Sequence, residues 1–238
     1  NMIQRMASPY DLNPFRLDPL RQIVSEHVDF DKVSRCTDMG VFISATNVET
    51  GRVQVFDREE ISLDATMASA CLPYMSQAVE IGGVPYWDGG FMGNPPLFPF
   101  FDETPSDDIL IVQINPIRRE GTPRTAVEIQ NRINEITFNS ALLHELRSIY
   151  MLDCLSKRGQ LGANAYRPKH IHIVSANDEM RHLDASSKLN AEWAFLLHLF
   201  EIGRTTAAGW LEAHFGDLGE RSSVDLDDMF GHLKLPCG

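Results

Sequence analysis

The chain has 238 residues, of which 43% are hydrophobic and 23% charged, an ordinary composition for a globular protein long enough to bury a core. Acidic residues outnumber basic ones by 33 to 21, so the formal net charge is -12. This balance argues against nucleic acid as a partner, because phosphate binding needs a basic surface. It also disfavours simple electrostatic adsorption to anionic lipid.

The four cysteines are widely spaced, with no Cys-x-x-Cys pair, and we expect free thiols with Cys71 buried. No apolar run reaches the roughly 18 residues that span a bilayer, and no signal peptide is visible. These features favour a cytoplasmic protein that makes at most transient contact with a membrane. The chain opens at Asn1 without a leading Met, and we expect it to be part of a longer polypeptide.

Two helices are expected in the first half of the chain. Asp18 before Pro19 is typical of an N-cap with proline at the first helical position, and predicts a helix to about His27. Ser62 is placed to cap a second helix, which must end before Pro73.

Two hairpins are expected around the second of these helices. The apolar, β-rich runs 41–46 and 52–56 are joined by a Thr-Gly turn and predict one hairpin. Gly82-Gly83 lies between two apolar arms, 78–81 and 84–87, and is a strong signal for the other.

The second half combines two buried-strand candidates, 109–114 and 170–174, with long helical stretches at about 124–156 and 187–215. Buried strands separated by long helices predict an α/β fold. We expect three layers, with a mostly parallel sheet, flanking helices and the hairpins as decoration.

The last helical stretch carries an apolar stripe, and we expect its aromatic residues Trp193, Phe195 and Phe200 to lie mostly in the core. Gly203 and Gly209 weaken the helical pattern and are candidates for a break.

A catalytic nucleophile is not evident in the chain. A Gly-x-Ser-x-Gly elbow needs two glycines four residues apart, and the pair with that spacing, Gly89 and Gly93, has Phe91 between its members. Asp88, by contrast, leaves an apolar strand at a double glycine, where the backbone can take positive φ and come close to a neighbour. Such a carboxylate can act as a base, or can simply bond to its own turn amides.

The segment Ala68-Ser69-x-x-x-Pro73, followed by Asp88-Gly89-Gly90, resembles the second half of the patatin-like phospholipase family. In that family a serine in a Gly-x-Ser-x-Gly elbow attacks an ester carbonyl, and the aspartate of Asp-Gly-Gly is its base. The resemblance therefore implies that Asp88 is a catalytic base, that Gly89 and Gly90 shape its turn, and that no metal or organic cofactor is needed. The substrate would be a lipid or another carboxylic ester.

The resemblance extends over nearly the whole chain, to a bacterial branch of the family with an additional C-terminal region. It implies a patatin-like fold that lacks its N-terminal portion and has a helical C-terminal extension. We assign residues 1–120 to the C-terminal part of the catalytic domain, and 121–238 to a mainly helical extension with one added strand. The matching segments are 8–14, 44–47, 93–97, 113–116, 131–136 and 222–226.

Other candidate sites are weaker. His170 and His172 are two residues apart, so both would face one side of a strand, but no third metal ligand is evident. The acidic residues Asp225, Asp227 and Asp228 are more typical of a solvated surface than of a calcium loop. Asn131, Asn134 and Asn139 could line a polar groove, but helix caps or side-chain hydrogen bonds explain them better.

Two functions remain open from the sequence. The first is a Ser-Asp acyl-ester hydrolase of the phospholipase, lipase or esterase type, with Asp88 as the general base and the serine supplied by sequence outside this chain. The second is a non-catalytic fragment or pseudoenzyme that serves as a binding module. In either case we expect an N-terminal segment of the same protein, or self-association, to complete the sheet.

Overall fold

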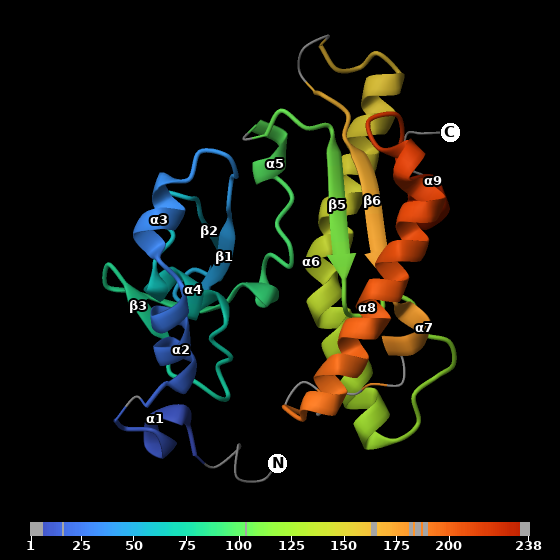
Figure 1. Ribbon diagram of the computed structural model, residues 1–238. Helices are drawn as coiled ribbons and strands as arrows, with labels where there is room; N and C mark the ends of the chain where they lie inside the picture. Colours follow the sequence, from blue (N-terminus) through green and yellow to red (C-terminus); the bar gives the residue numbers. More distant parts are fainter. Residues whose placement is uncertain are drawn as a thin grey trace. The chain divides into compact units, whose positions relative to one another are not determined.

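The computed structural model describes residues 7–15, 17–102, 104–162, 166–180, 183, 187 and 190–233 (Figure 1). It divides into two compact units, Asn1–Pro99 and Phe100–Gly238, which we describe separately as unit 1 and unit 2. The sequence assigned residues 1–120 to a catalytic domain and residues 121–238 to an extension. This assignment stays a prediction, because the compact units do not show where a catalytic domain ends.

Unit 1 contains a four-stranded sheet in the order β2-β1-β4-β3. Both expected hairpins are confirmed, and Gly82 and Gly83 have φ of 60° and 82°, as a tight hairpin turn requires. The expectation of a mostly parallel sheet is wrong here, because all three strand pairings are antiparallel. Short turns join the strands of each hairpin, and β4 then pairs with β1. The strands are β1 (Ile43–Asn47), β2 (Val53–Phe56), β3 (Val79–Ile81) and β4 (Val84–Asp88).

The two helices predicted in unit 1 begin where the sequence predicts. Asp18 accepts a hydrogen bond from the Arg21 amide at 3.0 Å, and Ser62 accepts one from the Ala65 amide at 3.1 Å. The helix that Ser62 caps packs on β1, β3 and β4, and its buried Ala65 forms part of the core. The helices are α1 (Pro9–Leu12), α2 (Pro19–His27), α3 (Phe30–Arg35), α4 (Leu63–Ser69) and the 3-10 turn η2 (Gly89–Phe91). Of these, α1, α3 and η2 were not predicted.

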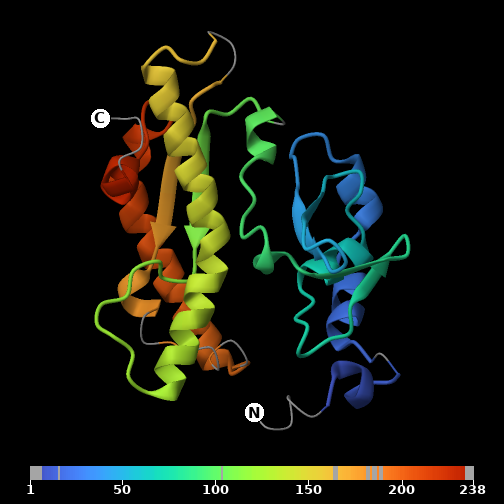
Figure 2. The ribbon, with the colours of Figure 1, turned by 180° about the vertical axis from the view of Figure 1, so that it is seen from behind.

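Unit 2 contains a parallel pair of strands, β5 (Asp108–Gln113) and β6 (His170–Ser175), between helices. Helix α6 (Ala126–Lys157) lies behind the strands in Figure 1 and in front of them in Figure 2, whereas α8 (Trp193–His214) lies on the opposite face. The expected α/β arrangement of a parallel sheet with flanking helices is confirmed in this unit. The remaining elements are α5 (Pro99–Asp102), α7 (Asn177–Met180), η4 (Phe215–Asp217), α9 (Leu226–Phe230) and η5 (Gly231–Leu233).

Helix α8 differs from the sequence-based expectation in two ways. It runs without a break through Gly203 and Gly209, since an isolated glycine lowers helix stability without ending the helix. Its aromatic residues are not in the core, because Trp193 is 71% exposed and Phe200 62% exposed.

The cysteines also depart from the expectation of free thiols. Cys36 and Cys71 are free, and Cys71 is buried as expected. Cys154 is disulfide-bonded, so the expectation is wrong there. Cys237 lies outside the described residues. Among the helices that the structure describes, none combines the length and apolar character needed to cross a membrane.

Candidate functional site

Asp88 is the last residue of β4 and the N-cap of η2. Its side chain is half-buried, and Oδ1 accepts a hydrogen bond from the Gly90 amide at 2.7 Å. The backbone is held on both sides, because the Asp88 N–H donates to the Cys71 carbonyl at 2.8 Å and the Asp88 carbonyl accepts from Thr46 Oγ1 at 2.8 Å. The carboxylate is therefore fixed in position by one turn amide and by a rigid backbone.

Residue 89 must be a glycine because its backbone lies very close to Ser44 of β1. A Cβ added at this position would lie 2.3 Å from the Ser44 carbonyl oxygen and 2.4 Å from Ser44 Oγ. The sequence also suggested positive φ at the double glycine, but Gly89 and Gly90 lie in the right-handed 3-10 turn η2 and do not have it. The Asp88 turn therefore sits directly against β1 because residue 89 has no side chain.

Two hydroxyl groups of β1 support this turn. Ser44 Oγ donates to the Gly93 carbonyl at 2.9 Å, and Thr46 Oγ1 donates to the Asp88 carbonyl at 2.8 Å. The sequence placed Ser44 and Thr46 on a strand but did not show that they contact the Asp88 turn. That contact depends on the pairing of β1 with β4, which are far apart in the chain.

We expect Thr46→Val to destabilise unit 1 by about 1–3 kcal/mol, because it leaves the Asp88 carbonyl without its hydroxyl donor while conserving side-chain volume. Urea unfolding of the variant measures this loss. Thr46→Ser keeps the hydroxyl and should recover most of the free energy of unfolding. Equal stability of Thr46→Val and the unmodified chain would show that the hydroxyl does not support the turn.

The segment Ala68-Ser69-x-x-x-Pro73 lies directly beside this turn. It forms the end of α4 and the residues after it, and Cys71 there provides the carbonyl that accepts the Asp88 N–H. Burial raises the pKa of the Cys71 thiol to about 11, and the nearby Asp88 charge adds to the rise. Since the thiolate is the reactive form of cysteine, Cys71 is an inert packing residue and not a nucleophile.

A pocket of about 730 Å³ adjoins the turn within unit 1. Trp87 from β4 and Phe91 from η2 line it, so its wall includes the residues on either side of Asp88-Gly89-Gly90. Asp88 itself does not line the pocket, because successive strand residues face opposite sides of a sheet. The other lining residues are Ala7, Ser8, Pro9, Asp11, Thr46, Gly51, Pro73, Tyr74 and Met92.

Comparison of the sequence with models of known protein families gives a match in the region of this site. Residues 8–101 match the model of the patatin-like phospholipase family. The match is consistent with the patatin-like phospholipase family that the sequence resembles. Its members act on lipid esters as acyl hydrolases, and the matched residues include the Asp88 turn and its pocket. No curated protein matches the chain.

Beyond the patatin-like segment, unit 2 brings together a serine, a histidine and an aspartate that the sequence analysis did not connect. His172 Nε2 lies 3.0 Å from Asp108 Oδ1, and His172 Nδ1 lies 3.1 Å from Ser223 Oγ. In a Ser-His-Asp hydrolase the serine bonds to Nε2 and the carboxylate to Nδ1, so the two ring nitrogens are used here in the opposite sense. The imidazole is also fully buried, and Trp210 packs edge-on against it at 5.8 Å. We therefore assign the cluster a structural role in joining β5, β6 and the segment after α8.

The Asp108 carboxylate should make the stability of unit 2 sensitive to acid. Burial opposes its charge, but hydrogen bonds from the Gly219 amide and His172 outweigh burial and lower its pKa below the usual 3.8. Its contribution to the free energy of unfolding is thus fully present above about pH 4 and is lost as the pH falls through the lowered value.

The measurement is urea unfolding at pH 6 and pH 3. We expect Asp108→Asn to be less stable than the unmodified chain at pH 6, and to lose less stability on going to pH 3. Asp31→Asn, an exposed carboxylate in unit 1, is the control and should leave the pH dependence of unit 2 unchanged. A pH dependence in Asp108→Asn that equals that of the unmodified chain would contradict this explanation.

The histidines considered as metal ligands lie close to one carboxylate, and one of the acidic residues caps a helix. His170 and His172 do face one side, toward Asp108, at 3.4 and 3.0 Å from its Oδ1. Asp225 caps α9 and accepts from two backbone amides. Over the ranges that the structure describes, no group of three or more His, Cys, Asp or Glu side chains is arranged to hold a metal ion.

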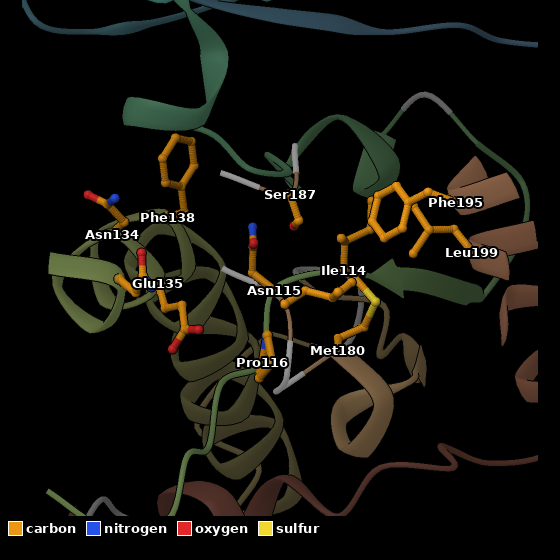
Figure 3. A pocket seen from close by; sticks show the side chains of 12 residues that line it. Ile114, Asn115, Pro116, Asn134, Glu135, Phe138, Met180, Ser187, Phe195 and Leu199 are labelled. Atoms are coloured by element: carbon orange, nitrogen blue, oxygen red, sulfur yellow. The ribbon is translucent and has the colours of Figure 1, made fainter. Parts of the chain in front are cut away.

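The three asparagines of α6 have different environments: one is buried and hydrogen-bonded, and two line a pocket. Asn139 is buried and donates to the Pro116 carbonyl at 3.0 Å. Asn131 and Asn134 line a small pocket of about 150 Å³ in unit 2, at the end of β5 (Figure 3). Figure 3 also shows Ile114 and Phe195 on its apolar side, so this pocket combines amide and hydrocarbon walls.

Proposed function

We propose that Asp88 is the general base of a Ser-Asp acyl-ester hydrolase acting on lipid, and that the serine is supplied by sequence outside this chain. The base would take the proton of the serine hydroxyl as the serine attacks the ester carbonyl. It would then activate the water that releases the acyl group. Asp88, Gly89 and Gly90 are the site residues of this proposal, and the chemistry calls for no metal or organic cofactor.

One observation carries the proposal: a half-buried carboxylate is held at the end of β4, beside a pocket, within a patatin-like segment. Positioning of this kind is what general base catalysis requires, since the base must be fixed within hydrogen-bond reach of the proton that it takes. The local bond from the Gly90 amide uses Oδ1, and a hydrogen bond to one oxygen of a carboxylate does not prevent it from accepting another.

A fluorophosphonate probe tests the serine directly, because it reacts covalently with activated serines. We expect no labelling of the 238-residue chain, and labelling of one serine in a longer protein that includes residues ahead of Asn1. Peptide mapping then identifies the serine. Labelling of the 238-residue chain itself would contradict the proposal that the nucleophile lies outside it.

The alternative function is a non-catalytic binding module, which the missing Gly-x-Ser-x-Gly elbow favours. It predicts that the longer protein is also unlabelled and does not hydrolyse short-chain p-nitrophenyl esters. The two functions therefore differ in the outcome of the same experiment.

We further propose that an N-terminal segment of the same protein, or a second copy of the chain, completes the sheet at β5. The outer edge of β6 is already occupied, since Ile171 bonds to Ser222 Oγ at 2.9 Å and to the Val224 amide at 3.3 Å. In the described part of the chain no strand pairs with the other edge of β5. Parallel sheets are normally covered on both faces.

Size-exclusion chromatography with light scattering tests this completion. We expect the 238-residue chain to self-associate when it is produced alone, because an open strand edge is a template for pairing. A well-folded monomer would contradict the proposal.

A further inference from the structure

The pocket beside the Asp88 turn is lined by aromatic residues and one carboxylate. Three aromatic residues, Tyr74, Trp87 and Phe91, contribute to its wall. Asp11 is the one charged residue among the described residues that line it, and no lysine or arginine is among them. A ligand in this pocket therefore meets aromatic rings and a single negative charge.

The Asp11 carboxylate is held in place and left partly open. Its Oδ2 accepts both the Ser8 amide at 2.8 Å and Ser8 Oγ at 2.7 Å. These two hydrogen bonds, the hydroxyl one foremost, lower the pKa of Asp11, so the group is ionised at neutral pH. None of the described residues donates a hydrogen bond to Oδ1, which leaves that oxygen able to face a ligand.

Aromatic faces together with a carboxylate form the chemistry that recognises organic ammonium ions. A cation is attracted to the negative face of an aromatic ring, and quaternary ammonium groups are bound in this way in aromatic cages. An anionic head group would instead approach the fixed charge of Asp11 with no compensating cation in the lining.

We propose that this pocket binds the organic ammonium head group of an ester lipid, through Tyr74, Trp87, Phe91 and Asp11. The proposal rests on the proposed function for one point only, namely that the cation belongs to the substrate. Trp87 and Phe91 flank Asp88-Gly89-Gly90 in sequence, so the head group would be bound at the same turn as the base, although the Asp88 side chain does not line the pocket. The pocket would then select substrates by head group and not by acyl chain.

Binding of choline to the 238-residue chain, measured by isothermal titration calorimetry or saturation-transfer NMR, tests the proposal without any need for the serine. The comparison ligand is 3,3-dimethylbutan-1-ol, which has the shape of choline without its charge. We expect choline to bind at least several-fold more tightly than this neutral analogue. Equal binding of the two, or no binding of choline, would overturn the proposal.

Variants locate the site. We expect Tyr74→Leu and Asp11→Asn each to weaken choline binding about two- to fivefold, the range for a cation-aromatic or ionic contact at an accessible site. Tyr74 is 76% exposed, so its replacement should not disturb folding. Trp87→Phe keeps a ring of weaker attraction for a cation and should lose less binding than Trp87→Leu. Trp193→Leu and Asp31→Asn alter a tryptophan and an aspartate that do not line the pocket, and they serve as matched controls. An equal loss of choline binding in the controls would contradict the assignment.

Failure of this proposal can be told apart from failure of the proposed function. If choline binds as expected but Asp88→Asn leaves ester hydrolysis unchanged, the head-group site stands and the assignment of the base is wrong. If hydrolysis depends on Asp88 but choline and its neutral analogue bind equally, the base stands and the pocket does not recognise a cation.

Discussion

If Asp88 is the general base that we propose, replacing it with asparagine should lower the kcat of the proposed hydrolase by a factor of about 10²–10⁴, the usual contribution of a general base. Asparagine has nearly the same shape and retains a carbonyl oxygen that can accept the Gly90 amide, so the turn should persist. What is lost is the ability to take a proton from serine and from water.

The measurement is steady-state hydrolysis of a short-chain p-nitrophenyl ester by the protein that includes the residues ahead of Asn1. Asp57→Asn is the matched control, because Asp57 also accepts turn amides, those of Glu59 and Glu60, away from the pocket. We expect the control to keep its kcat, and Asp88→Asn to keep its melting temperature while losing kcat. A rate within about threefold of the unmodified enzyme would show that Asp88 is not the base.

The largest effect on stability is expected from Gly89→Ala. The new Cβ would lie 2.3 Å from a backbone oxygen of β1, and a backbone atom cannot move aside as a flexible side chain can. Overpacking of this kind costs about 3 kcal/mol, which should lower the melting temperature of unit 1 by about 10 °C. The displacement of the turn that relieves this clash would also move Asp88 away from β1, so kcat should fall as well.

Gly209→Ala is the control for this experiment. It also replaces a glycine with alanine, but nothing lies within 4 Å of its added Cβ and it is in the interior of α8. Its replacement should therefore stabilise the helix by about 0.5–1 kcal/mol. Differential scanning calorimetry of the two variants should show shifts of opposite sign. A destabilisation of less than about 1 kcal/mol by Gly89→Ala would mean that β1 and the turn are not in close contact.

The geometry of Asp88 also fits a purely structural role in the turn. The bond from the Gly90 amide is the one that a purely structural turn aspartate would make. The match of residues 8–101 to the patatin-like model and the adjoining pocket favour catalysis. The substitution of Asp88 decides between the two because it removes basicity and leaves the turn bond.

Local signals in the sequence were sufficient for two helices and both hairpins of unit 1, but not for α1, α3 or η2. Asp18 and Ser62 cap helices as their residue types predict, and Gly82-Gly83 forms the expected turn. These features depend on interactions between residues a few positions apart, which a sequence displays directly. The same holds for α6, where Thr125 and Glu128 form a capping box.

The candidate site was only partly accessible from the sequence. Asp88 and its glycines were found through a motif, but the contact that makes Gly89 necessary comes from Ser44 on another strand. The link between Asp108, His172 and Ser223 was missed because these residues come from three distant segments. No periodicity or spacing rule connects residues that meet only when the chain folds.

By itself, the sequence determined the positions of helices and hairpins, the family resemblance and the choice of Asp88, since each depends on residues that are close in the chain. The tertiary structure decided that the sheet of unit 1 is antiparallel, that Gly89 permits contact with β1, and that aromatic rings and Asp11 share one pocket. The reason is that strand order, close approach and pocket lining are set by packing between distant segments, and packing is cooperative over the whole unit.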